Sequence, residues 1–152
     1  MLSFATSFSP NSNSFALFVN EKYEYEDKKQ TLSKDVSKKI NLYLKLLKSK
    51  KQKSEISSID ISDKKKCFII KIKNKKEKYY FEEVGGSFFT YIKNDKTINS
   101  IDIYADSLKE NKSNLSKFFS EFIFGFILKS YTFNKYKTLN KEKINKKIIF
   151  KI

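Results

Sequence analysis

Residue types that commonly carry out enzyme chemistry are scarce in this sequence. The chain has no histidine, so it lacks the commonest general base and the commonest metal ligand of proteins. Its one cysteine, Cys67, lies in the apolar segment CFIIKI, where we expect a small buried thiol and not a nucleophile. A single cysteine cannot form an intramolecular disulfide and fits a reducing compartment. The serines have no evident base to activate them, so the sequence identifies no catalytic residue.

The acidic residues are also poorly placed for binding a metal ion. They occur in the charged segments EYED (24–27), DISD (60–63) and FEE (81–83). None of these segments has the ligand spacing of a known metal site. We therefore expect solvated charges there, and the sequence predicts no metal-binding and no cofactor-binding residue.

Gly85 and Gly86 allow two interpretations. They lie in EEVGGSFFTYIKND, which predicts a helix that begins near Glu82 and has Val84, Phe88, Tyr91 and Ile92 on one face. Each glycine in a helix costs roughly 1 kcal/mol relative to alanine, so close packing against a neighbour is one explanation for the pair. A loop that cradles a phosphate is the other, although the wider glycine pattern of such loops is missing.

The net charge of +15 favours a nucleic-acid partner, because clustered cations release counterions from a phosphate backbone. The stretch SYTFNKYKT (130–138), in which aromatics and lysines are interleaved, could contribute to such a surface. Every basic residue is lysine, however, and arginine is the preferred residue for phosphate and guanine recognition. The lysine excess is also explained by solvated faces alone.

The same stretch has a structural explanation, since it follows the apolar segment FFSEFIFGFILK. We expect Phe133 and Tyr136 to anchor the exit of the chain, and Tyr131 to continue the buried face of a long helix. That face is the apolar stripe Leu115, Phe118, Phe119, Phe122, Ile123, Phe126, Ile127 and Tyr131. Lys135 and Lys137 would then lie near the negative end of the helix dipole.

Hydrophobic periodicity predicts strands and helices along the whole chain. Two strands joined by a tight loop are expected first, and every later strand or strand pair is preceded by a helix. The predicted strands are 2–8, 14–20, 55–62, 66–73, 97–106 and 146–152, and the predicted helices are 31–49, 82–95 and 113–137.

This order predicts an α/β fold, namely a single domain over residues 1–152 built as a three-layer α/β/α sandwich with a mixed, mostly parallel central sheet. The first twenty residues lack the pattern of a signal peptide. The apolar run from Phe118 to Leu128 is too short to span a bilayer. We therefore expect a soluble, cytoplasmic protein without a membrane partner.

The segment GFILKSYTFNKYKT (125–138) resembles the end of the N-terminal domain of the leucyl aminopeptidase (cytosol aminopeptidase) family. In that family a glycine-containing apolar helix runs into a Ser/Ala-Tyr-x-Phe-x-x-Tyr-Lys signature. The matching residues here are Gly125, Tyr131, Phe133, Tyr136 and Lys137. Collinear matches extend to VSKKINLYLKLLK, VGGSFFTYIK, INSIDIY and KKIIFKI, while Phe124 and Lys129 depart from the family pattern.

The resemblance implies a macro-domain-like fold that precedes a catalytic domain. It implies that two divalent metal ions, zinc or manganese, would be held by that catalytic domain, whose motifs this chain does not contain. The chain is then expected to be the non-catalytic domain of a cytosolic aminopeptidase. Its expected roles are packing on its own C-terminal catalytic domain and assembly of a homo-oligomer, a hexamer in the family.

Two alternatives remain beside this expectation. The first is a lysine-rich module that binds nucleic acid, which the charge would favour. The second is binding of ADP-ribose or another nucleotide, by analogy with macro domains. With three glycines in the chain, we expect the loops that wrap a diphosphate to be absent.

Overall fold

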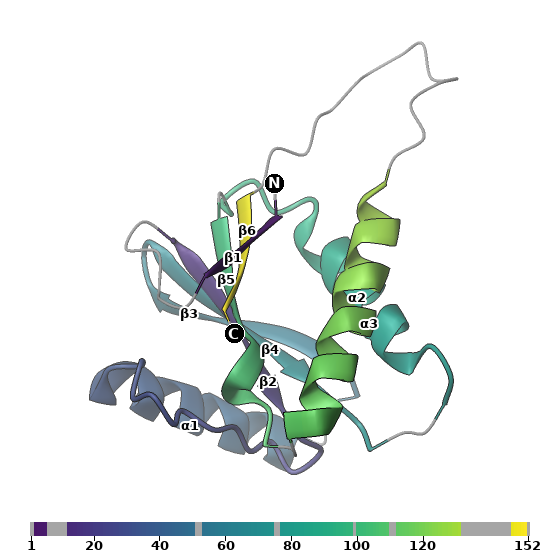
Figure 1. The fold of residues 1–152 in the computed structure, drawn as a ribbon. Coiled ribbons are helices and arrows are strands. Elements are labelled where there is room, and N and C mark those ends of the chain that lie inside the picture. The colour runs from purple at the N-terminus through teal and green to yellow at the C-terminus, as the bar shows by residue number, and fades with distance from the viewer. Residues whose placement is uncertain are drawn as a thin grey trace.

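The computed structural model describes residues 2–5, 12–50, 53–74, 77–98, 100–109, 112–131 and 147–151. Strands and helices alternate in the predicted order (Figure 1). The elements are β1 (Leu2–Ala5), β2 (Ser14–Val19), α1 (Lys34–Ser49), β3 (Ile56–Ser62), β4 (Lys65–Lys71), α2 (Tyr80–Ile92), β5 (Ser100–Tyr104), a 3-10 helix (Ala105–Ser107), α3 (Lys112–Ser130) and β6 (Lys147–Lys151).

A six-stranded sheet forms the centre of the fold, with strand order β1-β6-β5-β2-β4-β3. All neighbouring strands are parallel except β3, which pairs with β4 in an antiparallel direction at one edge. The predicted mixed, mostly parallel sheet is therefore confirmed. The two N-terminal strands are not neighbours, however, because β6 and β5 lie between β1 and β2.

The side chains of β2 show how the three layers are held together. Successive residues of a strand point to opposite faces, so Phe15 and Leu17 pack toward α1 whereas Ala16 and Phe18 pack toward α2 and α3. The same alternation occurs in β4, whose residues Cys67 to Ile70 are all buried. Continuous burial of this kind is typical of a strand covered on both faces, as the sequence predicted. Figure 1 shows α1 on one side of the sheet and the α2–α3 pair on the other.

Helix α1 begins three residues later than predicted. Ser33 is the N-cap, and its side chain accepts a hydrogen bond from the backbone N–H of Val36. The buried face is formed by Ile40, Leu44 and Leu47, which recur at the spacing of a helix. The Ser33 cap explains where the helix begins, and the apolar stripe explains which side of the helix faces the sheet.

Helices α2 and α3 cross at two glycines. A Cβ atom built on Gly85 would lie 2.9 Å from the carbonyl carbon of Phe122, and one built on Gly125 would lie 2.5 Å from the carbonyl carbon of Glu82. The two backbones therefore touch, and only glycine fits at either position. Because Gly85 and Gly86 both lie inside α2, the interpretation as a phosphate loop is wrong and close packing is the reason for Gly85.

Phenylalanines fill the space between these helices and the sheet. Phe118, Phe122 and Phe126 of α3 recur at four-residue spacing and are buried. The ring of Phe18 from β2 meets Phe118 and Phe122 edge to face, with centroids 5.0 and 5.1 Å apart. The aromatic stripe predicted for this helix is confirmed from Phe118 to Phe126.

The stripe does not continue to the end of the helix. The structure places the end of α3 at Ser130, and Ile127 is exposed although it was predicted to be buried. Tyr131, also predicted to be buried, is 72% exposed. Phe133, Lys135, Tyr136 and Lys137 lie outside the described residues. The explanation of SYTFNKYKT as the continuation of a buried face is therefore wrong at Tyr131.

Asp95 joins three segments at the amino-terminal edge of the sheet. Its carboxylate accepts hydrogen bonds from the Lys66 ammonium at 2.8 Å, from the Thr97 hydroxyl at 2.5 Å and from the Thr97 backbone N–H at 3.0 Å. The Asn13 side chain donates in turn to the carbonyl of Thr97 at 2.7 Å. Partial burial raises the pKa of Asp95, but the hydrogen bonds from Lys66 and Thr97 outweigh it and lower the pKa to about 2.

We expect Gly85→Ala and Gly125→Ala each to lower the free energy of unfolding by about 3 kcal/mol, because the added methyl group forces the two helix backbones apart. Gly86→Ala is the matched control, since its added Cβ would meet nothing nearer than 3.6 Å. This control should raise the free energy of unfolding by up to about 1 kcal/mol through helix propensity. Urea unfolding followed by circular dichroism measures all three variants, and equal effects at Gly85 and Gly86 would contradict the close crossing.

Asp95→Asn should lower the free energy of unfolding at pH 7 by about 1–3 kcal/mol, because it removes a charge-assisted hydrogen bond. The folded pKa of about 2 lies below the ordinary value of 3.8, so the carboxylate contributes stability above pH 3.8 that is lost as the pH falls toward 2. The difference between variant and wild type should shrink over that range. Asp63→Asn, at an exposed position between β3 and β4, is the control and should change stability little at either pH.

Candidate functional site

Among the described residues, no three His, Cys, Asp or Glu side chains come together where they could hold a metal ion. Cys67 is fully buried, its thiol faces the α1 layer of the core, and burial raises its pKa. The predicted burial of this thiol is confirmed, and buried thiols in apolar surroundings react poorly. In this part of the chain no helix is long and apolar enough to cross a membrane.

The carboxyl ends of β2, β4 and β5 frame a pocket of about 330 Å³, which we call the carboxyl-edge pocket. Open α/β sheets bind ligands at this edge, so its chemistry decides whether a nucleotide fits. The lining combines both charges, with Glu21 and Glu24 among Lys22, Lys73 and Lys109. Lys73 is ion-paired with Glu55, so the two carboxylates balance Lys22 and Lys109 and the lining has no excess of positive charge for a diphosphate.

Backbone amides of the loop after β2 already have acceptors. The Asn20 side-chain oxygen accepts from the backbone N–H groups of Lys22 at 3.0 Å and Glu24 at 2.9 Å, and the Asn20 backbone carbonyl accepts from the N–H of Tyr23 at 2.9 Å. The Asn20 amide also donates to the Glu24 carboxylate at 3.0 Å, which lowers the pKa of Glu24. The loop after β2 is therefore closed on itself. The backbone N–H groups that cradle phosphates in other proteins are used internally here.

The opposite, amino-terminal edge holds a pocket of about 560 Å³ that is rich in lysines. Three of them are engaged within the chain. Lys66 pairs with Asp95, the Lys39 ammonium donates to the carbonyl of Ile61 at 2.8 Å, and the Lys65 ammonium lies over the Phe15 ring, 5.4 Å from its centroid. Asp60 and Asp63 line the same pocket. This arrangement satisfies its own charges and does not form a uniformly basic surface for nucleic acid.

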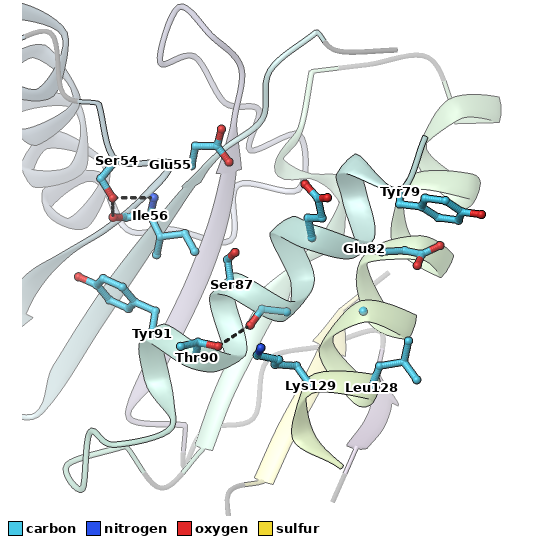
Figure 2. A pocket seen from close by; sticks show the side chains of 13 residues that line it. Ser54, Glu55, Ile56, Tyr79, Glu82, Ser87, Thr90, Tyr91, Leu128 and Lys129 are labelled. Atoms are coloured by element: carbon cyan, nitrogen blue, oxygen red, sulfur yellow. Dashed lines mark hydrogen bonds between the residues drawn. The ribbon is translucent and has the colours of Figure 1, made fainter. Parts of the chain in front are cut away.

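A groove of about 930 Å³ lies over the outer side of α2, and we call it the α2–α3 groove. Figure 2 shows Ser54, Glu55 and Ile56 on one side of it and side chains of α2 and α3 on the other. Exposed apolar or aromatic side chains in its lining are Tyr79, Tyr91 and Leu128. Phe124 and Ile127 extend the exposed apolar surface along α3. Sequence analysis missed this surface because it placed Tyr91 and Ile127 on buried faces, which is wrong for both, and gave Phe124 and Leu128 no place on a binding surface.

Tyr79 is held at the entrance to α2 in an unusual backbone conformation. Its φ of 68° lies in the left-handed region, which bulky residues adopt rarely. Its side chain makes no capping hydrogen bond to the helix, and its ring is about half exposed. The next residue, Tyr80, is buried and its hydroxyl accepts a hydrogen bond from the backbone N–H of Lys73 at 2.9 Å. The left-handed turn lets two adjacent tyrosines face opposite environments, one in the core and one at the groove.

Comparison with solved structures finds this fold in a leucine aminopeptidase and in macrodomains. A tomato leucine aminopeptidase mutant matches with a TM-score of 0.63 at 11% identity, over 98% of this chain and 32% of its own, in the N-terminal domain. The macrodomain of Thermus aquaticus DarG matches with a TM-score of 0.64 at 12% identity, over 100% of this chain and 98% of its own. The macrodomain of Mycobacterium tuberculosis DarG matches with a TM-score of 0.62 at 10% identity, again over 100% and 98% of the two chains.

These likenesses confirm the predicted macro-domain-like, three-layer α/β fold and, at such low identity, show the fold alone. The chain spans about a third of the aminopeptidase chain that it matches. No family model matches the sequence, and no curated protein matches it.

Isothermal titration of the chain with ADP-ribose should give no binding heat. The reasons are the closed Asn20 loop and the two carboxylates of the carboxyl-edge pocket. A saturable signal with 1:1 stoichiometry would contradict this prediction. Glu24→Gln removes the carboxylate that Asn20 holds, and a signal that appears only in this variant would identify charge repulsion as the sole barrier.

Proposed function

We propose that this chain is a non-catalytic interaction domain of the kind found at the N-terminus of leucyl aminopeptidases. The observation that carries the proposal is the exposed apolar surface of α3 beside the α2–α3 groove. Phe124 is 52% exposed and Leu128 is 55% exposed, although both belong to a helix whose other face is fully packed. An apolar surface of this kind marks a place where another protein surface binds.

The likeness to the aminopeptidase over 98% of this chain supports the same proposal, because it concerns a domain and not a whole enzyme. The role includes packing on a catalytic domain and assembly of a homo-oligomer, a hexamer in the family. The metal ions of the reaction, zinc or manganese, would be held by that other domain. There they would supply the activated water that attacks the peptide bond.

The macrodomain likeness gives no comparable support for a nucleotide-binding function. It covers the chain as completely, but the carboxyl-edge pocket lacks the charge and the free amides that a diphosphate needs. Shared fold does not transfer function without a matching site. A nucleic-acid partner is likewise less well supported, because the lysine-rich pocket at the amino-terminal edge pairs most of its own cations.

The purified chain should show no turnover of leucine-p-nitroanilide in the presence of Mn²⁺ or Zn²⁺, at enzyme concentrations where a full aminopeptidase gives a clear signal. The physical reason is the lack of a metal-ligand cluster in the described residues. A tomato leucine aminopeptidase preparation serves as the positive control. Turnover that co-purifies with the chain and is abolished by EDTA would overturn the proposal.

A further inference from the structure

The α2–α3 groove is locally acidic in a chain whose net charge is +15. Its lining contains Glu55, Glu82 and Glu83 and one lysine, Lys129, and the Lys78 ammonium lies over the ring of Tyr79 at one end, 4.8 Å from its centroid. Glu55 forms an ion pair with Lys73, so Glu82 and Glu83 are the carboxylates that remain for a ligand. Neither is in an ion pair with a described residue. A cationic surface is the complement of this groove.

The groove also offers apolar contacts beside its charges. Tyr79 and Tyr91 lie toward the two ends of α2, and Leu128 comes from α3 (Figure 2). All three side chains are about half exposed. A surface that fits here must therefore combine apolar side chains with positive charges, which is the composition of one face of a basic amphipathic helix.

This chain carries such a face on α1. Leu42 and Leu46 are each 54% exposed and point away from the sheet, because Ile40, Leu44 and Leu47 occupy the opposite, buried side. Helical spacing places Lys38 and Lys45 next to Leu42 on the outer face, where both lysines are exposed.

We propose that the α2–α3 groove binds the outer face of α1 from a second copy of this chain. Leu42 and Leu46 of one copy would contact Tyr79, Tyr91 and Leu128 of the next. Lys38 and Lys45 would face Glu82 and Glu83. Charge complementarity between two surfaces of the same chain selects a second copy as the occupant.

The two surfaces lie on opposite faces of the sheet, since α1 covers one face and α2 with α3 covers the other. The contact is therefore head to tail, and each copy uses one surface to bind and the other to be bound. Such contacts build rings when the rotation closes and open stacks when it does not. The inference rests on the proposed function as an assembly domain and specifies which surfaces assemble.

Two charge-reversed variants test the contact. The groove variant is Glu82→Lys with Glu83→Lys, and the helix variant is Lys38→Glu with Lys45→Glu. Because Glu82 and Glu83 lie in the first turn of α2, where acidic residues stabilise the helix, circular dichroism must first show that the groove variant is folded. Leu128→Ser is a second groove variant that leaves those charges in place.

Sedimentation velocity at about 100 µM and low ionic strength should show species larger than the monomer for the wild type and only monomer for each variant. An equimolar mixture of groove and helix variants should recover species larger than the monomer, because the two intact surfaces fit each other and the two reversed surfaces are again opposite in charge. Added salt should shift the wild type toward monomer.

A wild type that stays monomeric overturns this inference but leaves the proposed non-catalytic function standing, since that function is tested by aminopeptidase turnover. Self-association of the helix variant would show that grooves bind each other or that a different surface is used. Failure of the mixture to form species larger than the monomer would equally exclude the head-to-tail contact.

Discussion

The contact between the backbones of α2 and α3 is the constraint on which this structure depends. Gly85 and Gly125 lack the side-chain atoms that would separate the helices, and each lies against the backbone of the opposite helix. The two helices therefore act as one layer. That layer brings Phe118, Phe122 and Phe126 onto β2 in a single aromatic cluster with Phe18, and the cluster covers one face of the sheet.

The same crossing explains why the outer surface of the helix pair is available. Helix α3 is fixed by its contact with α2 at Gly125 and does not need a further contact on its outer side. That outer side carries exposed apolar side chains at Phe124 and Leu128. Folding of the domain accounts for the buried stripe but gives no reason for these exposed residues. Binding to another surface does give a reason, because burial of apolar area outside the domain would stabilise a complex.

The sequence predicts much of the fold because its periods are strong. The continuous apolar run of β4 and the spacing of Ile40, Leu44 and Leu47 identify a central strand and a one-faced helix without ambiguity. The sequence could not predict which strands are neighbours. The position of β6 between β1 and β5 depends on pairing between distant segments, which leaves no local signal in the sequence. Gly85 was recognised as unusual, but only its contact with Phe122 decides between a phosphate loop and a helix crossing. Tyr131 follows the helical spacing and is still exposed, because α3 ends at Ser130 and periodicity alone does not report where a helix ends.

The carboxyl-edge pocket shows why the shared fold does not settle the function. A macro-domain-like sheet places a pocket at the carboxyl ends of its strands whatever the loops contain. In this chain the Asn20 side-chain oxygen accepts hydrogen bonds from the backbone N–H groups of Lys22 and Glu24. These two N–H groups are therefore engaged within the loop after β2 and do not point to a ligand. The residues that remain exposed and unmatched lie elsewhere, on α1 and along the α2–α3 groove. On the function proposed here, the leucines, tyrosines and complementary charges that the helices expose are the binding surfaces, and the carboxyl-edge pocket takes no part.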